Sequence, residues 1–290
     1  MEKPLVSVLL ASYNHARYVE TAVRSVMAQT GVSFELIVID DGSPDESPEI
    51  LKRLSQELHF EFVSRPNRGL VPTLNEMLEK ADGEFICTLA SDDTMLAGRL
   101  EKQSAYMLSH PGAVASFGQV RLMDADGRLS GGADPRYLRG VPRVTFAELL
   151  LGEKELHGCT EMIRRRTLLD VGGYDERFKF EDYPLWLALS HRYGPLPVVP
   201  DVFCHYRETP AGMHHRLNFI YSQCLAAIAL YKEDPLYPEA VRNWKANWFS
   251  ALAYANKGEA FRRLPSLATP SWAFIKRFPK LFIPRKFLRH

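Results

Sequence analysis

Two adjacent carboxylates, Asp92 and Asp93, follow an apolar segment over residues 85–89 that is typical of a buried strand. Adjacent acids repel each other unless a positive group lies beside them. Ligands of open α/β sheets bind at the carboxyl ends of the strands, where this pair stands. Mg²⁺ or Mn²⁺ holding a diphosphate would suit the pair, because these ions prefer carboxylate and phosphate oxygens. A solvated loop in which Asp93 caps the next helix is the alternative for the pair taken alone.

A second acidic pair, Glu181 and Asp182, precedes a helix predicted over residues 184–193. Asp182 stands before Tyr183 and Pro184, and an aspartate followed by an early proline is typical of a helix N-terminus. Capping would hold the carboxylate rigid and leave its second oxygen free. Such a carboxylate in a partly dry cleft could remove a proton from a hydroxyl group. On the residues alone, a structural cap and a general base both stay open for Asp182.

The elements that must position these acids alternate between strands and helices. Apolar runs predict strands over residues 5–11, 34–39, 60–64 and 85–89, and helical spacing predicts helices over 16–29, 48–58 and 74–81. This alternation with short links predicts βαβ units and a mostly parallel sheet. Further helices are expected over 99–108, 146–151 and 166–171, and further strands over 114–123, 160–164 and 198–206. A hairpin turn is expected at 124–127, and a long loop over 128–144.

Two other nucleotide-binding folds are excluded by the placement of glycine. A dinucleotide-binding domain needs glycines in the first strand-to-helix turn so that the backbone can approach the pyrophosphate. The corresponding turn here, residues 11–17, contains no glycine, although Asp40 falls where a ribose-binding acid would stand. The sequence also lacks the glycine-rich loop of P-loop proteins. NAD binding and P-loop chemistry are therefore not expected.

The composition is that of an ordinary globular protein, with 46% hydrophobic and 24% charged residues and a net charge of +1. This balance implies no global attraction to polyanions. The four cysteines are far apart in the sequence, which argues against a zinc site or a disulfide framework and fits a reducing compartment. They are Cys87, Cys159, Cys204 and Cys224. We expect no signal peptide and no membrane-spanning helix.

Five short motifs occur in a fixed order along the first part of the chain. They are the segment 6–14 before an amphipathic helix, Ile39-Asp40-Asp41-Gly42-Ser43, Asn67-Arg68-Gly69, Asp82-Gly83-Glu84 and Asp92-Asp93. The series resembles the family 2 glycosyltransferases over about the first 210 residues. The resemblance implies the GT-A fold, a Rossmann-like, mostly parallel α/β sheet flanked by helices. It also implies a nucleotide-diphospho-sugar donor, with a UDP-sugar expected, and Mn²⁺ or Mg²⁺ as cofactor.

The resemblance assigns the donor site to the ends of the first strands. In that family the acid matching Asp41 contacts the nucleobase, and the acidic motif binds ribose and metal. Many relatives place a further acid where this chain has Ala90. Asp93 is then the expected metal ligand, with Asp92 on the ribose or as a second ligand. The complete expected donor set is Ala11, Tyr13, Asn14, Asp41, Asn67, Arg68, Asp92 and Arg207.

The acceptor side follows a Gly-Gly-aromatic-acid turn over residues 172–176. In the family the acid matching Asp182 is the catalytic base, which implies inversion of the anomeric centre by single displacement. Glu181 is expected to support the loop or to bind an acceptor hydroxyl. Relatives often carry Tyr-Arg-x-His after the last strand, whereas this chain has Thr209 in place of the histidine. The candidates for a metal-binding histidine are His205, His214 and His215, and Arg207 is a candidate diphosphate contact.

The C-terminal third predicts helices over residues 217–231 and 238–256, followed by a basic and aromatic tail over 258–290. The tail holds eight Lys or Arg residues against one acid, Glu259, and six large aromatic residues. Such a mixture is typical of segments in a membrane interface, although nucleic-acid binding can use the same composition. Prolines at positions 265, 270, 279 and 284 predict several short pieces. A solvated tail with buried aromatic residues is the structural alternative.

We therefore predict a catalytic domain over residues 1–215, with a donor part (1–98) and an acceptor part (99–215), and a helical region over 216–290. The predicted enzyme is an inverting, metal-dependent glycosyltransferase of surface polysaccharide or lipid-linked oligosaccharide synthesis. It would work in the cytoplasm, in peripheral contact with the anionic inner face of the cytoplasmic membrane, and without nucleic acid. One alternative is a nucleotidyltransferase acting on sugar phosphates, whose glycine-rich loop is missing here. The other is an inactive sugar-nucleotide-binding module.

Overall fold

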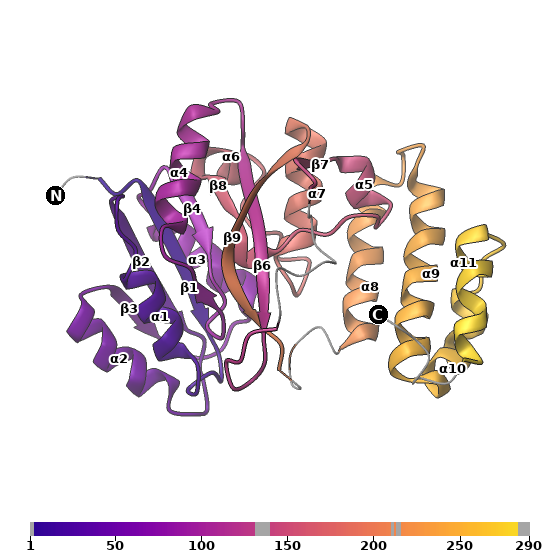
Figure 1. The fold of residues 1–290 in the computed structure, drawn as a ribbon, viewed down its shortest axis with the longest axis horizontal. Coiled ribbons are helices and arrows are strands. Elements are labelled where there is room, and N and C mark those ends of the chain that lie inside the picture. The colour runs from indigo at the N-terminus through magenta and orange to yellow at the C-terminus, as the bar shows by residue number, and fades with distance from the viewer. Residues whose placement is uncertain (1–2, 131–139, 210–211, 213–215, 284–290) are drawn as a thin grey trace. The chain divides into compact units, whose positions relative to one another are not determined.

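The computed structural model describes residues 3–130, 140–209, 212 and 216–283 (Figure 1). The chain divides into two compact units. The first unit comprises residues 1–146 and 154–209, and the second comprises 147–153 and 210–290. Most of the predicted loop over 128–144, together with His214 and His215, lies outside the described residues.

The first unit is built on a nine-stranded sheet with strand order β3-β2-β1-β4-β8-β6-β9-β5, in which β7 also pairs with β9 (Figure 1). The strands at one end run parallel, as the alternation of strands and helices predicts. Their bounds are Val6–Ser12 (β1), Phe34–Asp40 (β2), Glu61–Ser64 (β3) and Phe85–Thr88 (β4). Ser12 of β1 pairs with Asp40 of β2, so the polar loops that follow both strands leave the sheet at one edge.

The other end of the sheet has mixed strand directions. β8 runs antiparallel to both β4 and β6, whereas β9 runs parallel to β6. The short strands β5 and β7, which the sequence pattern does not predict, pair antiparallel with β9. The bounds are Thr94–Met95 (β5), Ala115–Met123 (β6), Arg143–Val144 (β7), Met162–Arg164 (β8) and Leu196–Arg207 (β9). Pairing of Thr94 with His205 brings the chain after the acidic motif against β9.

The helices that precede β9 follow the predicted order, with two corrections. Their bounds are Val19–Met27 (α1), Ser47–Leu58 (α2), Leu70–Lys80 (α3), Arg99–Ser109 (α4), Phe146–Leu150 (α5), Arg165–Asp170 (α6) and Asp182–Tyr193 (α7). Asp182 is the first residue of α7, and Glu181, not Asp182, occupies the N-cap position. A 3-10 helix, Gly158–Thr160 (η1), replaces the start of the strand predicted over 160–164.

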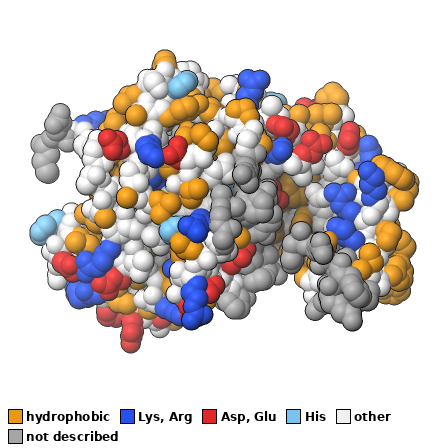
Figure 2. Space-filling view, in the orientation of Figure 1, with side chains coloured by type: hydrophobic (Ala, Val, Ile, Leu, Met, Phe, Trp, Pro, Cys, Tyr) orange, Lys and Arg blue, Asp and Glu red, His pale blue; other side chains and the backbone are white. Residues whose placement is uncertain are grey.

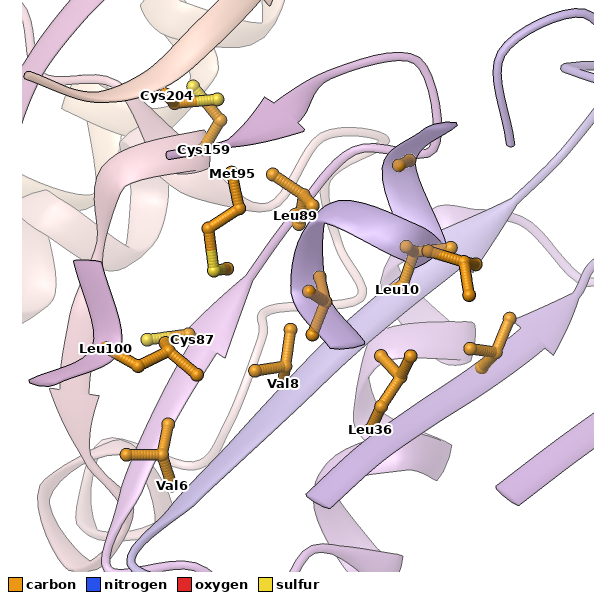
Figure 3. Packing of buried hydrophobic residues seen from close by; sticks show 14 of the residues in the cluster. Val6, Val8, Leu10, Leu36, Cys87, Leu89, Met95, Leu100, Cys159 and Cys204 are labelled. Carbon is orange, nitrogen blue, oxygen red and sulfur yellow. The ribbon is translucent and has the colours of Figure 1, made fainter. Parts of the chain in front are cut away.

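The core of the first unit lies against β1, whose residues Val6, Val8 and Leu10 are buried in one cluster (Figure 3). Residues two apart point to the same face of a strand, so these three form a continuous apolar row. Helix α1 contributes four buried residues at helical spacing to the same cluster: Val19, Ala22, Val23 and Val26. Burial of each large apolar side chain contributes about 1.5–3 kcal/mol to stability. This packed layer gives the loops at the strand ends a rigid support.

The second unit is helical, in agreement with the helices predicted for the C-terminal third. The bounds are Leu217–Ile228 (α8), Ala229–Tyr231 (η3), Tyr237–Ala255 (α9), Lys257–Leu267 (α10), Trp272–Arg277 (α11) and Phe278–Leu281 (η4). Phe249 lies at the centre of its core, with ring centroids 4.8 Å from Phe274 and 6.2 Å from Phe278. Helix α10 continues through Pro265, which corrects the break predicted there. Among the described helices, none combines the length and apolar character that a membrane crossing requires.

Candidate active site

The turn after β1 is tied to two other loops at the carboxyl edge of the parallel strands. Asn14, whose φ is 58°, donates its backbone N–H to Ser43 Oγ at 2.8 Å. The side chain of the next residue, His15, lies with Nδ1 2.8 Å from Ser91 Oγ. The turn is thereby held between the loop after β2 and the acidic motif. These contacts join loops that are 29 and 76 positions apart in the sequence.

Asp41, the expected nucleobase contact, is a buried acid that organises the loop after β3. Its Oδ1 accepts hydrogen bonds from Arg65 Nη1 and from the Arg68 N–H, the latter at 2.9 Å. Its Oδ2 accepts the Gly69 N–H at 2.8 Å. The Asn67 side chain donates to the Asp41 backbone carbonyl at 2.7 Å. Asp41 therefore fixes residues 65–69 through its own acceptors.

The remaining expected donor residues of these loops differ in exposure. Ala11 is partly buried at the end of β1, whereas Tyr13 is 50% exposed. The Arg68 side chain is also open to solvent and reaches Glu76 at 3.5 Å. The side chains of Tyr13 and Arg68 are therefore open to a ligand, and Asn14 and Asn67 are exposed as well.

The two acids of the motif lie in different environments. Asp93 is 2% exposed, and its Oδ1 accepts the Arg207 backbone N–H at 2.8 Å. Within the described part of the chain, Asp93 Oδ2 has no hydrogen-bond partner, and burial raises the pKa of this carboxyl well above its ordinary value. Asp92 is more exposed, and its Oδ2 lies 3.8 Å from His15 Nε2. Asp92 therefore faces the surface, and Asp93 faces the interior.

Two buried thiols lie beside Asp93. Cys159 and Cys204 place their sulfur atoms, with a carboxylate oxygen of Asp93, within 4.8 Å of one another, and Figure 3 shows the two cysteines side by side. A hydrogen bond with the neighbouring Cys204, together with burial, raises the pKa of Cys159 well above its ordinary value, so its thiol stays protonated at neutral pH. His205, the next residue on β9 after Cys204, does not belong to this group, and successive strand residues point to opposite faces.

Arg207, the expected diphosphate contact, is held by several contacts within the chain. The residue is buried, and its Nε donates to the backbone carbonyl of Asp92 at 2.7 Å. Its Nη1 donates to the carbonyl of Asp124 at 3.0 Å, and the guanidinium lies 4.4 Å from the centre of the Tyr18 ring. Arg207 thus fixes the acidic motif to the predicted hairpin turn and to β9.

Glu181 and Asp182 lie at the start of α7, and both are partly buried. Asp182 Oδ1 accepts the Tyr183 backbone N–H at 2.6 Å. Burial raises the pKa of Asp182 to about 6. Burial, with the neighbouring Asp182 charge, raises the pKa of Glu181 to about 8. Asp182 is therefore charged at neutral pH and more basic than an exposed aspartate, as a general base requires, while Glu181 still carries its proton.

A third acid of this region, Glu161, is fully buried between β4 and α7. Its Oε1 accepts from Thr88 Oγ1 at 2.9 Å, and its Oε2 accepts from Trp186 Nε1 at 3.1 Å. Thr88 ends the strand that leads to the acidic motif, and Trp186 stands one turn after Asp182. Burial raises the pKa of Glu161 to about 7, and the charge of Asp182 adds to this shift. Glu161 therefore connects the donor strand to the helix that carries the expected base.

Helix α4 holds the segment around Glu161 in place. Arg99, a completely buried cation, donates to the carbonyls of Cys159 at 2.5 Å and of Glu161 at 3.0 Å. Its Nε donates to Gln103, which in turn donates to the Thr160 carbonyl at 2.8 Å. Buried carbonyls with such partners avoid the free-energy cost of unpaired polar groups. The segment is thereby fixed by side chains about sixty positions earlier in the sequence.

The glycine-rich turn before the acidic pair is fixed to α3. Asn75 Oδ1 accepts the Tyr174 N–H at 2.9 Å, and Asn75 Nδ2 donates to the Tyr174 carbonyl at 2.9 Å. Gly173 has a φ of 77°, and a Cβ there would lie 2.8 Å from Asn75 Oδ1. Only glycine meets both conditions without strain. Helix α3 begins at the loop that Asp41 organises, so the donor and acceptor sides share a support.

Four residues of this region carry no signal in the sequence pattern. The role of each becomes apparent only from a contact with a residue that is distant in the sequence. The separation ranges from 24 positions for the Arg65–Asp41 pair to 76 for the His15–Ser91 pair. Local periodicity and motifs do not register such partners. The four are His15, Arg65, Arg99 and Glu161.

The sequence profile of Glycosyl transferase family 2 matches residues 7–172, more than half of the chain. The chain belongs to this family. The match spans the predicted donor motifs and confirms the predicted family and the class of enzyme, a glycosyltransferase. It ends before Asp182, so the assignment of the base rests on other grounds.

Two relatives extend over much of the chain. TuaG of Bacillus subtilis, whose name proposes a glycosyltransferase of teichuronic acid biosynthesis, is 31% identical over 191 residues, which cover 64% of this chain and 72% of TuaG. An uncharacterized protein of Mycobacterium tuberculosis is 29% identical over 265 residues, which cover 85% of this chain and 82% of that protein. The second alignment therefore reaches into the helical unit.

Two solved structures confirm the predicted fold. TarS of S. aureus, in complex with UDP-GlcNAc, superposes with a TM-score of 0.66 at 18% identity and covers 95% of this chain and 80% of that chain. The mannosyltransferase PcManGT of Pyrobaculum calidifontis, in complex with GDP-Man and Mn²⁺, gives a TM-score of 0.64 at 20% identity, with 97% and 86% covered. The mixed, mostly parallel sheet with its helices is the GT-A fold.

Proposed function

We propose that this family 2 glycosyltransferase moves a sugar from a nucleotide-diphospho-sugar to a hydroxyl group of a glycan or lipid-linked saccharide, with inversion at the anomeric carbon. The observation that carries the proposal is the Asp182 carboxylate, which is partly exposed and has a pKa of about 6. It begins helix α7, and Glu161 connects Trp186 of this helix to the strand before the acidic motif. The complexes of TarS with UDP-GlcNAc and of PcManGT with GDP-Man support this donor class. We favour a UDP-sugar.

The nucleobase is proposed to bind where Asp41 organises the loops. Ionised carboxylates offer roughly four acceptor sites, and the chain's own donors occupy three of those of Asp41. One site on Oδ2 is left for an N–H of the base. Register pairing of β1, β2 and β3 brings the surrounding loops to the same edge. The residues that we assign to the donor on these loops are Ala11, Tyr13, Asn14, Asn67 and Arg68.

A divalent cation, Mn²⁺ or Mg²⁺, fits the acidic motif. Asp93 Oδ2 is a buried oxygen without a partner in the described residues, and Asp92 adds a more exposed carboxylate on the same turn. We propose that Asp93, with Asp92, holds the ion, while Asp92 also serves the ribose. The ion would supply positive charge for the diphosphate leaving group. His205 lies outside the group of closely spaced ligands, so no role in metal binding is proposed for it.

The residues of this chain then have separate tasks. Asp182 takes the proton of the acceptor hydroxyl, which becomes a stronger nucleophile as the proton leaves. The Tyr183 N–H occupies Oδ1, so we assign proton acceptance to Oδ2. Glu181, still protonated near neutral pH, is assigned to donate a hydrogen bond to the acceptor or its loop. Attack from the side opposite the diphosphate inverts the anomeric carbon.

The decisive test is thermal unfolding of the full chain with UDP-, GDP- and dTDP-sugars, with and without Mn²⁺. A true donor at about one hundred times its dissociation constant should stabilise the fold by about 2.7 kcal/mol. In Asp93→Asn, which keeps an oxygen for the Arg207 N–H, the Mn²⁺-dependent part of the shift should disappear. Asp126→Asn, at an exposed ion pair with Arg17, is the matched control and should behave as the wild type.

The same assay separates the alternatives. Donor binding without transfer or hydrolysis of a labelled sugar would support the inactive binding module. If none of the three nucleotide sugars shifts the unfolding temperature, the donor proposal fails. The family match already favours a sugar transferase over a nucleotidyltransferase.

The acceptor is proposed to be a surface polysaccharide precursor or a lipid-linked saccharide. The name of TuaG, which points to teichuronic acid biosynthesis, supports a cell-envelope polymer. A lipid-linked acceptor would be held at the inner face of the cytoplasmic membrane, within reach of a cytoplasmic enzyme. We therefore propose a cytoplasmic enzyme in peripheral contact with that membrane.

A further inference from the structure

The end of the helical unit exposes several large hydrophobic side chains. Phe261 and Trp272 are each 67% exposed, Ile275 is 56% exposed and Phe282 is 70% exposed. In Figure 2, hydrophobic side chains gather over the region of α11, with Lys and Arg side chains beside them. We call these four residues the apolar face of the second unit. Large exposed apolar groups that come together within one short segment mark surfaces that bind a partner.

These residues are not needed for the internal packing of the unit. Phe274 and Phe278 face inward and pack on Phe249 of α9. Trp272 and Ile275, three positions apart on α11, share another side of this helix and remain exposed. The chain thus uses one set of aromatic residues for its core and keeps a second set on the surface.

Two contacts place Phe261 and Phe282 of the apolar face at one end of the unit. Lys257 Nζ donates to the carbonyl of Ile283, so residue 283 lies beside the start of α10. Phe261 stands one turn after Lys257 on the same side of α10. The Phe282 ring packs edge-on against Phe278 at 5.6 Å. Phe261 and Phe282 therefore border the same end of the unit.

The charge around the apolar face is strongly positive. The described residues 256–283 contain six cations and one acid, Glu259. Lys276 Nζ lies 5.3 Å from the centre of the Trp272 ring, and the Arg262 side chain is 78% exposed. Some cations are already engaged: Arg277 donates to Asn247, Lys280 to Ser250 and Arg262 to Glu259. Their positive charge nevertheless adds to the field at this end of the unit.

We propose that the apolar face, with Arg262 and Lys276 around it, binds the surface of an anionic lipid bilayer. Aromatic side chains enter the headgroup region, where an apolar ring beside a cation is favoured. The cations are attracted to the negative surface potential of the leaflet. The inference deepens the proposed function, because it rests on that proposal for the choice of a lipid-linked acceptor. Adsorption itself depends only on the second unit.

Tryptophan fluorescence offers a direct test, since three of the four tryptophans are buried. Trp186, Trp244 and Trp248 are 4–7% exposed, whereas Trp272 is 67% exposed. Phosphatidylglycerol vesicles should shift the emission of the full chain to shorter wavelength, and brominated lipid should quench the shifted component. Phosphatidylcholine vesicles and high salt should weaken both effects. Trp272→Phe should abolish the spectral change and still co-sediment with the vesicles.

The variant Phe261→Ser/Trp272→Ser/Phe282→Ser tests the whole apolar face. Its partition coefficient into phosphatidylglycerol vesicles should fall by at least about tenfold, because three large side chains no longer leave water. Leu230→Ser, at a residue of η3 that is 45% exposed and outside the face, is the matched control and should partition as the wild type. Unchanged partitioning of the triple variant would overturn the proposal.

Other occupants would give different results. A blue shift that grows with protein concentration in the absence of vesicles would indicate a second copy of the chain on this face, and would overturn the membrane assignment. A blue shift of the emission with single-stranded oligonucleotide, but none with anionic vesicles, would also overturn the membrane assignment and would indicate nucleic-acid binding. The triple variant should keep the thermal shift with donor sugar. If the wild type bound none of the donor sugars, the proposed function would be refuted, whereas the membrane inference would still stand.

Discussion

Two groups of acids in the first unit are buried in opposite ways. Asp41, at the end of β2, accepts from the guanidinium of Arg65 and from two backbone N–H groups. Glu161, Glu181 and Asp182 lie near one another. Burial raises their pKa values to about 7, 8 and 6, respectively. Asp41 is thus surrounded by hydrogen-bond donors, whereas the other three acids are buried near other carboxyl groups.

The comparison separates binding from acid–base chemistry. A carboxylate with fixed donors can shape a loop for a ligand. A carboxylate without a cationic partner exchanges its proton near neutral pH, and such groups suit general acid–base catalysis. The loop after β3 is thus organised by an acid with fixed donors, whereas the start of α7 carries acids that change their protonation near neutral pH.

Asp182→Asn should have the largest effect on activity. Asparagine keeps an oxygen for the Tyr183 N–H but cannot take the acceptor's proton, so turnover should fall by about 10²–10⁴ while donor affinity stays the same. Steady-state transfer rates and calorimetry with nucleoside diphosphate measure the two quantities. Asp175→Asn, in the same loop and paired with exposed Arg177, is the matched control. A variant with near-normal turnover would leave Asp182 with a structural role only.

Asp41→Ala should have the largest effect on stability. Removing the buried Asp41 carboxylate leaves Arg65 with Glu76 as its remaining counter-charge and deprives the Arg68 and Gly69 N–H groups of their acceptor, at a cost of about 3–5 kcal/mol in the free energy of unfolding. Urea unfolding measures this loss, and Asp126→Ala, at an exposed ion pair with Arg17, should change it by less than about 1 kcal/mol. Equal effects of the two substitutions would show that burial does not distinguish Asp41.

Glu161→Gln should make stability less dependent on pH. The folded pKa of Glu161 is raised to about 7 from an ordinary 4.5, so the folded state binds a proton that the unfolded state has released. Wild-type stability should therefore fall between pH 4.5 and 7, and the variant should gain up to about 3 kcal/mol on the wild type across this window. Urea unfolding of both proteins at several pH values measures the difference. A difference that stays flat with pH would contradict the raised pKa.

The smallest expected effect concerns Glu181→Gln. Turnover of the wild type should fall below about pH 6, as Asp182 takes up a proton. Glu181, with a pKa of about 8, is still neutral there, so its replacement by glutamine should leave this acid limb in place. Any loss of wild-type activity above pH 8 should disappear in the variant. A shift of the acid limb by more than about one unit would mean that Glu181 is charged when Asp182 titrates.

The sequence by itself determined the frame of the protein. Apolar runs and helical spacing place the parallel strands β1 to β4 and their helices within a few residues of the predicted bounds. The motifs that end these strands follow directly, because a short loop keeps its residues beside the strand from which it leaves. The family and its fold could therefore be recognised before any contact was known.

Tertiary structure alone decided how the side chains of the site are used. Arg207 lies 115 positions from the Asp92 carbonyl that it binds, and Glu161 lies 73 positions from Thr88. Asp93 and Asp92 are neighbours in sequence, yet one faces the interior and the other the surface. Burial, pKa and hydrogen-bond partners depend on distances between segments that fold together. Local sequence patterns do not predict those distances, so the environment of each acid can be determined only from the folded structure.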